Sequence, residues 1–156
     1  METEAMIDAV RDFLDADDWH YEYDAEHNVI RAGVTLKCKM KRANMVMRFR
    51  QTDYNVYMIA PISADPANLG EVLRYTALAN YGLANGNFEV DVEDGEIRYK
   101  SYVDCDGLET LPKELFDDGI NACWAMMDRY GDGFAALAMG FSDADTEIKK
   151  AEPSDE

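Results

Sequence analysis

Hydrophobic and polar residues alternate along several stretches of this chain, and elsewhere hydrophobic residues recur every three or four positions. Alternation predicts strands over residues 19–24, 29–41, 44–52, 55–62, 87–92 and 97–103. The helical period predicts helices over residues 3–15, 65–81 and 112–130. Gly131-Asp132-Gly133 is expected to end the third long helix, and residues 134–141 to form a short last one.

The predicted elements follow the order α-β-β-β-β-α-β-β-α, then a short α. Asp94-Gly95 between two alternating runs is typical of a hairpin, and strands joined by hairpins pair antiparallel. We therefore expect an α+β fold with an antiparallel sheet of five to six strands and helices on one face. Residues 1–141 are expected to form a single domain, and residues 142–156 an acidic tail without fixed structure.

The stretch from residue 28 to residue 52 contains no acidic residue. It holds seven of the fifteen Lys and Arg residues of the chain. If Asp53-Tyr54 forms a two-residue turn, Arg50 faces Tyr57 and Arg48 faces Ile59 on the side away from the core. The alternation thus predicts a cationic sheet face with two apolar side chains beside it.

A second turn would bring like charges together. If Arg42-Ala43 is the preceding turn, Lys37 lies opposite Arg48, a pair that costs about 0.2–1 kcal/mol. The same counting in the last hairpin gives complementary pairs, Asp91 with Arg98 and Glu89 with Lys100. The contrast suggests that the basic face is kept for a partner, and we take as candidate partner-binding residues Lys37, Lys39, Arg48, Arg50, Tyr57 and Ile59.

Two interpretations of this basic face remain open. It could receive an acidic, partly apolar partner, either a peptide or the acidic tail of the chain itself, residues 142–156. Alternatively, long Lys and Arg side chains cover an exposed sheet face while neighbouring acids neutralise them.

The formal net charge of −17 narrows the classes of partner. It argues against sequence-independent binding to nucleic acid and against binding to an anionic membrane surface, since both need clustered cations. A hydrophobic content of 47% is sufficient for one sizeable core. The N-terminus resembles no signal peptide and no apolar run reaches the length of a membrane span, so we expect a cytoplasmic protein.

No pattern of catalytic or metal-binding residues stands out, and we predict a non-catalytic protein without metal or cofactor. His20 and His27 lack further ligands at zinc spacing, and the acidic clusters lack the glycine of an EF-hand loop. GxSxG, Walker A and GxGxxG motifs are absent. Cys38 and Cys123 fall on apolar faces and are expected in the core, whereas Cys105 is expected to be an exposed thiol.

Three stretches of the chain resemble the YbjN domain family of bacterial proteins. They are VRDFLDADDWHYEYDAEHNVIRAGV with the helix before it, LRYTALANYGLANGNFEVDVEDGEIRYKSYV, and LETLPKELFDDGINACWAMMDRY. The resemblance covers most of residues 5–130 and implies a type III secretion chaperone-like fold and a role in regulating sensory transduction. It implies no catalytic residue. Chaperones of this fold are commonly dimers that hold extended partner segments, so a homodimer is a further expectation.

Three functions follow as hypotheses. The first is a chaperone-like or regulatory module that binds a protein or peptide, which predicts an exposed apolar patch or an unpaired strand edge. The second is a sensor of a small anion or ligand at the basic sheet face. The third is an enzyme with an unrecognised site, which predicts a deep pocket where titratable groups converge.

Overall fold

A computed structural model describes residues 1–154 of the chain. The strands are β1 Glu22–Asp24, β2 Val29–Thr35, β3 Arg42–Phe49, β4 Asp53–Ser63, β5 Asn87–Val90 and β6 Glu96–Asp104. The helices are α1 Thr3–Ala16, α2 Leu69–Asn80, α3 Lys113–Ala138 and α4 Ala144–Ala151, with a 3-10 turn, η1 Pro66–Asn68, before α2.

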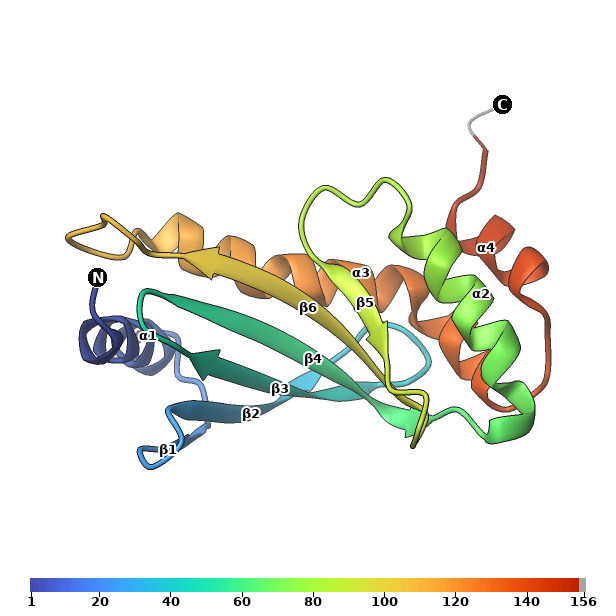
Figure 1. Cartoon of the computed structure of the whole chain (residues 1–156), viewed down its shortest axis with the longest axis horizontal. Coiled ribbons are helices and arrows are strands. Elements are labelled where there is room, and N and C mark those ends of the chain that lie inside the picture. The colour runs from blue at the N-terminus through green and yellow to red at the C-terminus, as the bar shows by residue number, and fades with distance from the viewer. Residues whose placement is uncertain (155–156) are drawn as a thin grey trace.

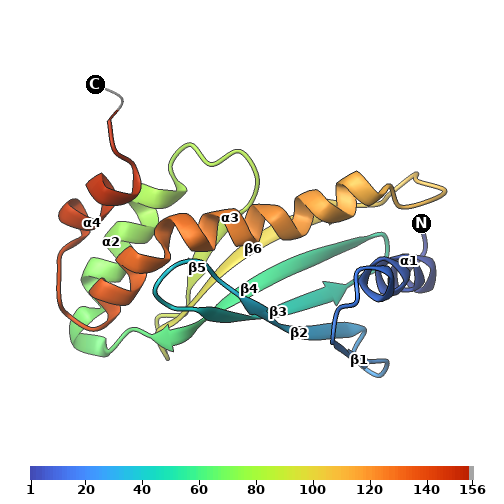
Figure 2. The same ribbon diagram turned by 180° about the vertical axis from the view of Figure 1, so that it is seen from behind.

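All six strands form one antiparallel sheet in the order β1-β2-β3-β4-β6-β5. Helix α3 lies across one face of this sheet, with α1 at one end of the molecule and α2 and α4 at the other (Figures 1 and 2). We call the face that packs on α3 the inner face and the opposite one the outer face. The α+β fold and the order of its elements are confirmed.

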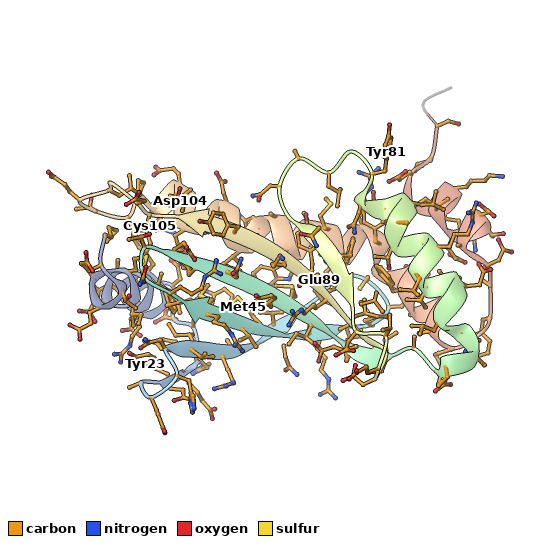
Figure 3. The ribbon with its side chains drawn as sticks, viewed as in Figure 1. Tyr23, Met45, Tyr81, Glu89, Asp104 and Cys105 are labelled. Atoms are coloured by element: carbon orange, nitrogen blue, oxygen red, sulfur yellow. The ribbon has the colours of Figure 1, made fainter. Side chains whose placement is uncertain are left out.

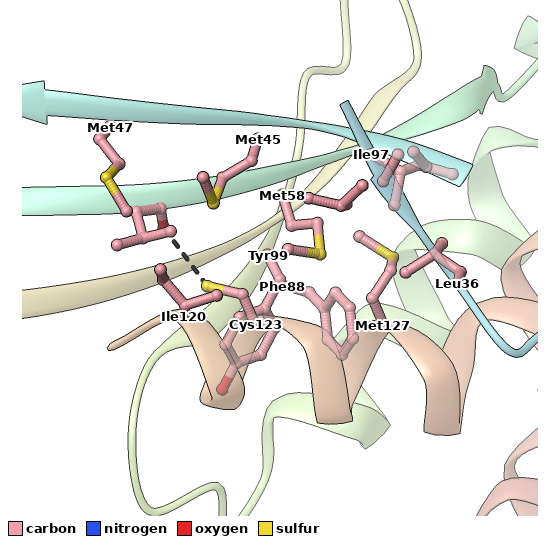
Figure 4. Close-up of a cluster of buried hydrophobic side chains, with 14 of the residues drawn as sticks. Leu36, Met45, Met47, Met58, Phe88, Ile97, Tyr99, Ile120, Cys123 and Met127 are labelled. Atoms are coloured by element: carbon pink, nitrogen blue, oxygen red, sulfur yellow. Dashed lines mark hydrogen bonds between the residues drawn. The ribbon is translucent and has the colours of Figure 1, made fainter. Parts of the chain in front are cut away.

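The core fills the space between the inner face and the helices. Met45, Met47 and Met58 on the central strands are fully buried, as is Met127 on α3 (Figure 4). The thiol of Cys123 on α3 lies 3.5 Å from the carbonyl oxygen of Val56, so helix and sheet are in close contact. The strand residues Met45, Met47, Val56 and Met58 belong to the inner set of the alternating pattern, which is why the pattern predicted the strands.

Helix α3 does not end at Gly131-Asp132-Gly133, and the predicted short helix 134–141 is its last part. The two glycines serve close packing. A Cβ atom at Gly131 would lie 2.8 Å from the sulfur of Cys38, and one at Gly133 would lie 2.2 Å from the hydroxyl oxygen of Tyr75. The prediction of a break was wrong because packing outweighs the modest helix penalty of glycine.

The apolar spacing in residues 65–81 predicts that Leu69, Val72, Leu73 and Ala77 face the core, but of these only Val72 is buried. Leu73 is 38% exposed, whereas Tyr75 is fully buried. Tyr75 donates a hydrogen bond to the carbonyl oxygen of Tyr130 and packs edge-on against Phe134, with 4.8 Å between the ring centroids. The contacts of Tyr75 with α3 therefore determine which side of α2 faces the core.

The tail also differs from the prediction, because helix α4 forms within it and packs on α2 and α3. Asp143 caps this helix by accepting a hydrogen bond of 2.8 Å from the backbone N–H of Thr146. The N–H of Ala144 donates to Glu71, and Arg74 pairs with Asp145 at 2.9 Å. The described part of the tail thus contacts the helices rather than the outer face, while residues 155–156 lie outside the described residues.

Strand β2 ends at Thr35 instead of continuing to residue 41 as predicted. Two carboxylates of α3 hold the following loop. Asp128 accepts a hydrogen bond of 2.7 Å from the backbone N–H of Lys37, and Asp132 accepts one of 2.7 Å from that of Lys39. These contacts satisfy backbone groups that would otherwise pair in the sheet, and they end the strand.

The hairpin registers also differ from the predicted ones. The turn between β3 and β4 is closed by a hydrogen bond from the N–H of Arg50 to the carbonyl oxygen of Asp53, so its tip is at residues 51–52. In the last hairpin Val90, not Val92, lies opposite Ile97. That turn is longer than two residues because Gly95, with a φ of 78°, packs against the backbone of Ala64.

Candidate partner-binding surface

The outer face of the sheet has no helix over it within residues 1–154. Figure 3 looks onto this face, with α3 behind the sheet. Its centre consists of three partly exposed apolar side chains, Val46 on β3 and Tyr57 and Ile59 on β4. Val46 lies directly opposite Tyr57, and Asn44 lies opposite Ile59, so the three side chains form one apolar strip.

Cationic side chains border this strip. The guanidinium of Arg98 lies 4.3 Å from the ring centre of Tyr57, a cation–π contact. Arg48 is exposed, lies opposite Asn55, and makes no ion pair within the described residues. Arg48, Tyr57 and Ile59 thus lie on this face as predicted, but the predicted pairs of Arg50 with Tyr57 and Arg48 with Ile59 do not form, because Tyr57 lies opposite Val46 and Ile59 opposite Asn44.

Most of the other cations on this face are paired with acids. Arg98 and Lys100 contact Glu89 at 3.0 and 3.2 Å, and Arg31 lies 3.6 Å from Asp24. At the border of the face, Arg50 binds Asp53 at 2.7 Å, a hydrogen bond that raises the pKa of the guanidinium. Nearby acids thus neutralise much of the face, as the second interpretation of the sequence expected.

The acids nevertheless stay at the rim. Along β2 and β3, and from Asn55 to Ile59 on β4, no acidic residue is present. The carboxylates belong to the edge strands and strand ends, and they are Glu22, Asp24, Asp53, Glu89, Glu96 and Asp104. In a protein of net charge −17, the centre of this face is therefore apolar and cationic.

Lys37 and Lys39 do not lie on this face. Both are exposed in the loop at residues 36–41, where their backbone N–H groups bind α3. The predicted like-charge pair does not exist, because Arg48 lies opposite Val29 on β2 rather than opposite Lys37. The pair was predicted wrongly because β2 ends at Thr35. Asp128 of α3 binds the backbone N–H of Lys37 and so ends the strand there.

A shallow hollow of about 660 Å³ opens beside the apolar strip. Its walls include Tyr21, Val46 and Ile59, and Gly33 on β2 contributes exposed backbone. Among residues 1–154, no heavy atom lies within 4 Å of the position that a Cβ atom of Gly33 would occupy. The signal in the sequence that could have indicated this site is Gly33 itself, since an isolated glycine within a strand is typical of a close backbone approach.

The three thiols of the chain lie apart from this surface, whereas the imidazole of His20 lines the hollow. Cys105, expected to be exposed, is fully buried, because its backbone continues the sheet by a hydrogen bond to Thr52, and Cys38 and Cys123 are buried as predicted. Burial raises the pKa of Cys105 and brings that of Cys123 to about 11, so both thiols stay protonated at neutral pH. His20 is exposed, as predicted.

His27 forms a contact of 2.8 Å with Asp24, whose pKa this hydrogen bond lowers. Within residues 1–154 no group of three His, Cys, Asp or Glu side chains is arranged to hold a metal ion. In the same range, the helices lack the combination of length and apolar character that crossing a membrane requires.

The fold and this surface define a class of protein, an α+β domain with one antiparallel sheet that helices cover on the inner face only. Comparison with known families then identifies it. The model of the YbjN family, described as "Putative bacterial sensory transduction regulator", matches residues 7–136. The chain therefore belongs to the YbjN family, as the three sequence stretches indicated, and the description of the family supports a regulatory role.

Solved structures agree with this assignment. The chain is similar to the crystal structure of YbjN from E. coli, itself described as "a putative transcription regulator", with a TM-score of 0.62. The alignment covers 86% of this chain and 93% of that one at 9% sequence identity, so the likeness concerns the fold. No curated protein sequence matches the chain significantly.

Proposed function

We propose that this protein is a regulatory module without catalytic chemistry that binds a protein or peptide partner on the outer face of its sheet. The observation that carries the proposal is the apolar strip of Val46, Tyr57 and Ile59, which no helix covers within residues 1–154. An apolar strip of this kind, bordered by polar residues, is typical of surfaces that bind other proteins.

The charge pattern supports a particular kind of partner. Arg48 and Arg42 on β3 make no ion pair within the described residues, and both are exposed. The partner segment therefore carries apolar side chains for the strip and carboxylates for these arginines. Of the residues first chosen from the sequence, Arg48, Tyr57 and Ile59 form the proposed surface with Arg50 at its border, and Lys37 and Lys39 fall outside it.

The alternative of a small-anion sensor receives less support. Such a site needs several unpaired cations close together, whereas Arg31, Arg98 and Lys100 are each within 3.6 Å of a carboxylate oxygen. A bound anion would have to replace these pairs. A partner that buries the apolar strip leaves them in place.

Affinity purification from the native cell, with tagged variants, tests the proposal. A double variant, Arg48→Glu with Tyr57→Ala, changes the surface, and Lys149→Glu on the exposed side of α4 is a control with the same charge reversal. We expect a partner that co-purifies with the wild type and the control to be lost with the double variant. With that partner purified, its Kd should rise at least about tenfold.

Equal recovery by all three proteins would contradict the proposal. A partner lost only with the Lys149→Glu control would place the surface on the helices instead. The same preparations, measured by light scattering with and without partner, report whether the module acts as the homodimer that the family resemblance implies.

A further inference from the structure

Strand β2 is longer than the edge strand beside it. β1 pairs with β2 only from Val29 to Arg31, whereas β3 pairs with β2 along its whole length, from Val29 to Thr35. Residues 32–35 therefore have a neighbouring strand on one side only. An edge of this kind carries backbone groups that can pair with another chain.

The pattern of hydrogen bonds shows which groups these are. In an antiparallel sheet, alternate residues bond to opposite neighbours. The N–H of Phe49 on β3 donates to the carbonyl oxygen of Asn28 at 3.0 Å, so residues 28, 30, 32 and 34 bond to β3. Gly33 and Thr35 consequently turn their backbone N–H and C=O groups to the open side.

One of these groups has a partner of another kind. The indole N–H of Trp124 on α3 donates to the carbonyl oxygen of Thr35 at 2.7 Å. The N–H and C=O of Gly33 and the N–H of Thr35 make no hydrogen bond to any residue in the range 1–154. The open edge thus offers two donors and one acceptor in the geometry of a strand.

This edge also lacks the usual protection. Natural sheets block exposed edges with charged residues, proline or bulges, yet the side chains here belong to glycine and threonine. Another open stretch of the sheet, where β6 continues past β5, differs because it includes the carboxylate of Asp104 and the bulky Tyr102. On the terminal strand β5, the side chain of Asn80 already binds the backbone N–H and C=O of Phe88. The stretch at Gly33 is therefore better suited to strand addition than either of these.

The hollow beside Gly33 determines which side chain would fit. A residue directly opposite Gly33 in an added strand points to the same face of the sheet, which is the outer face. There it meets the space of about 660 Å³ with Tyr21, Val46 and Ile59 in its walls. Since Gly33 has no side chain, a large apolar group can fill this space.

The charge of Arg42 indicates which kind of residue the added strand would carry at its next outer-facing position. The residue opposite Thr35 in the added strand, two positions away, also points to the outer face. Arg42 lies across from Thr35 on β3 and has no ion partner among residues 1–154. A carboxylate at this position of the partner can reach Arg42, whereas most of the surrounding protein surface repels it.

We propose that an extended segment of the partner adds to the sheet along Gly33–Thr35, with a large apolar side chain in the hollow and an acidic residue two positions away near Arg42. This inference rests on the proposed function, since it specifies how the partner of the outer face is held. The added strand would place the partner's side chains on the same face as the apolar strip of Val46, Tyr57 and Ile59, with only Gly33 of β2 between them at the hollow.

Amide hydrogen exchange measured by NMR, with a defined peptide as probe, tests the inference. The probe is an acetylated and amidated heptapeptide of threonines with one phenylalanine and one glutamate two positions apart, in either order. The control peptide has the same composition with these two residues adjacent. In the protein alone, the amides of Gly33 and Thr35 should exchange at least about tenfold faster than those of Ala32 and Val34, which bond to β3.

Saturation with the probe should slow the exchange of Gly33 and Thr35 and leave the other two amides unchanged. Two variants act on different features of the site. Gly33→Pro removes an edge donor, and Gly33→Val fills the hollow but keeps that donor. Each should raise the Kd of the probe about tenfold or more, whereas the control peptide should bind weakly to every protein.

Unchanged exchange at Gly33 under saturating probe would overturn the inference, as would equal affinities of the two peptides. The purified partner separates this result from a failure of the proposed function. If the Arg48 and Tyr57 double variant loses the partner while both Gly33 variants retain it, the outer face binds but strand addition is wrong. If all of these variants retain the partner, both the binding on the outer face and the strand addition are wrong.

Discussion

The two faces of the sheet are built from the same strands and differ in what covers them. On β3 and β4, Met45, Met47 and Met58 turn inward and are fully buried under α3. Val46 and Ile59, their neighbours in sequence, turn outward and remain partly exposed. The hydrophobic residues of the inner face are explained by the fold, whereas those of the outer face are not.

This difference separates stability from binding. Burial of the inner side chains removes apolar area from water and supplies the main favourable free energy of folding. The outer strip contributes less, because its side chains keep contact with water. We therefore expect substitutions on the inner face to change folding, and substitutions on the outer face to change mainly the binding of a partner.

The largest effect is expected from truncation of two adjacent residues, Met58 and Ile59. Met58→Ala leaves a cavity in the core and should lower the free energy of unfolding by about 2–5 kcal/mol. Ile59→Ala, on the outer face, should cost about 1 kcal/mol. Urea unfolding followed by tryptophan fluorescence measures both values, and equal costs would mean that the outer face is packed as tightly as the inner one.

Glycines on the two sides of the sheet offer a second contrast. Gly133→Val would place a Cβ atom 2.2 Å from the hydroxyl of Tyr75 and disturb its hydrogen bond to Tyr130, at a cost of about 2–3 kcal/mol. At Gly33 an added Cβ atom meets no heavy atom of residues 1–154 within 4 Å, and valine favours the strand, so Gly33→Val should stabilise the protein by up to about 1 kcal/mol.

Thermal or urea unfolding of the two valine variants gives the sign of each effect. A destabilised Gly33→Val protein would show that the open side of β2 is more constrained than its surroundings indicate. If Gly133→Val were as stable as the wild type, α2 and α3 could move apart without loss of stability. The explanation that close packing requires glycine at position 133 would then be wrong.

The alternation of residues was sufficient to predict which side chains belong to each face. Met45, Met47 and Phe49 form one set of the alternating pattern in residues 44–52 and are buried, whereas Arg48 and Tyr57, predicted for the side away from the core, lie on that side. Alternation depends only on the geometry of a strand, so it survives errors in where the strand begins or ends.

The register of the hairpins and the end of β2 could not be obtained in this way. The loop after Thr35 is held by Asp128 and Asp132, which follow it by about ninety residues in the sequence. The last turn depends on the contact of Gly95 with Ala64, again from another element. Lys37 and Lys39 were misplaced because tertiary contacts, rather than local pattern, determine their position.

The pKa values of groups buried beneath the inner face predict how the stability of the protein depends on pH. Burial raises the pKa of Cys123 to about 11 and those of Tyr99 and Tyr130 to about 12, above the values of these groups in an unfolded chain. The native state then retains protons that the unfolded chain loses. The stability that these groups contribute is therefore complete below about pH 9 and falls as the pH rises toward 11 and 12.

Urea unfolding at pH 8, 9, 10 and 11 tests this dependence. For Cys123 alone, the free energy of unfolding should fall by about 1.4 kcal/mol per pH unit above pH 9. The Cys123→Ala variant is less stable at pH 8 but should show a smaller decrease between pH 9 and pH 10. An identical slope in both proteins would contradict the assignment of this decrease to the buried thiol.

The smallest change in stability is expected from the cation–π contact between Arg98 and Tyr57 on the outer face. The guanidinium lies 4.3 Å from the ring centre and also binds Glu89 at 3.0 Å, but both side chains are only partly buried. A double-mutant cycle with Arg98→Ala and Tyr57→Ala should give a coupling free energy of about 0.5–1 kcal/mol. A cycle of Arg48→Ala with Tyr57→Ala, two residues without a cation–π contact, is the control and should give a coupling near zero.

A coupling above about 2 kcal/mol between Arg98 and Tyr57 would place them among the contacts that hold the fold together. The partly exposed ring of Tyr57 would then be explained by stability, and the argument that it is kept for a partner would lose its strongest residue. A small coupling has the opposite consequence. Because such a contact gives little to folding, an aromatic ring in the middle of an uncovered sheet face needs a reason outside the fold, and the binding of a partner supplies one.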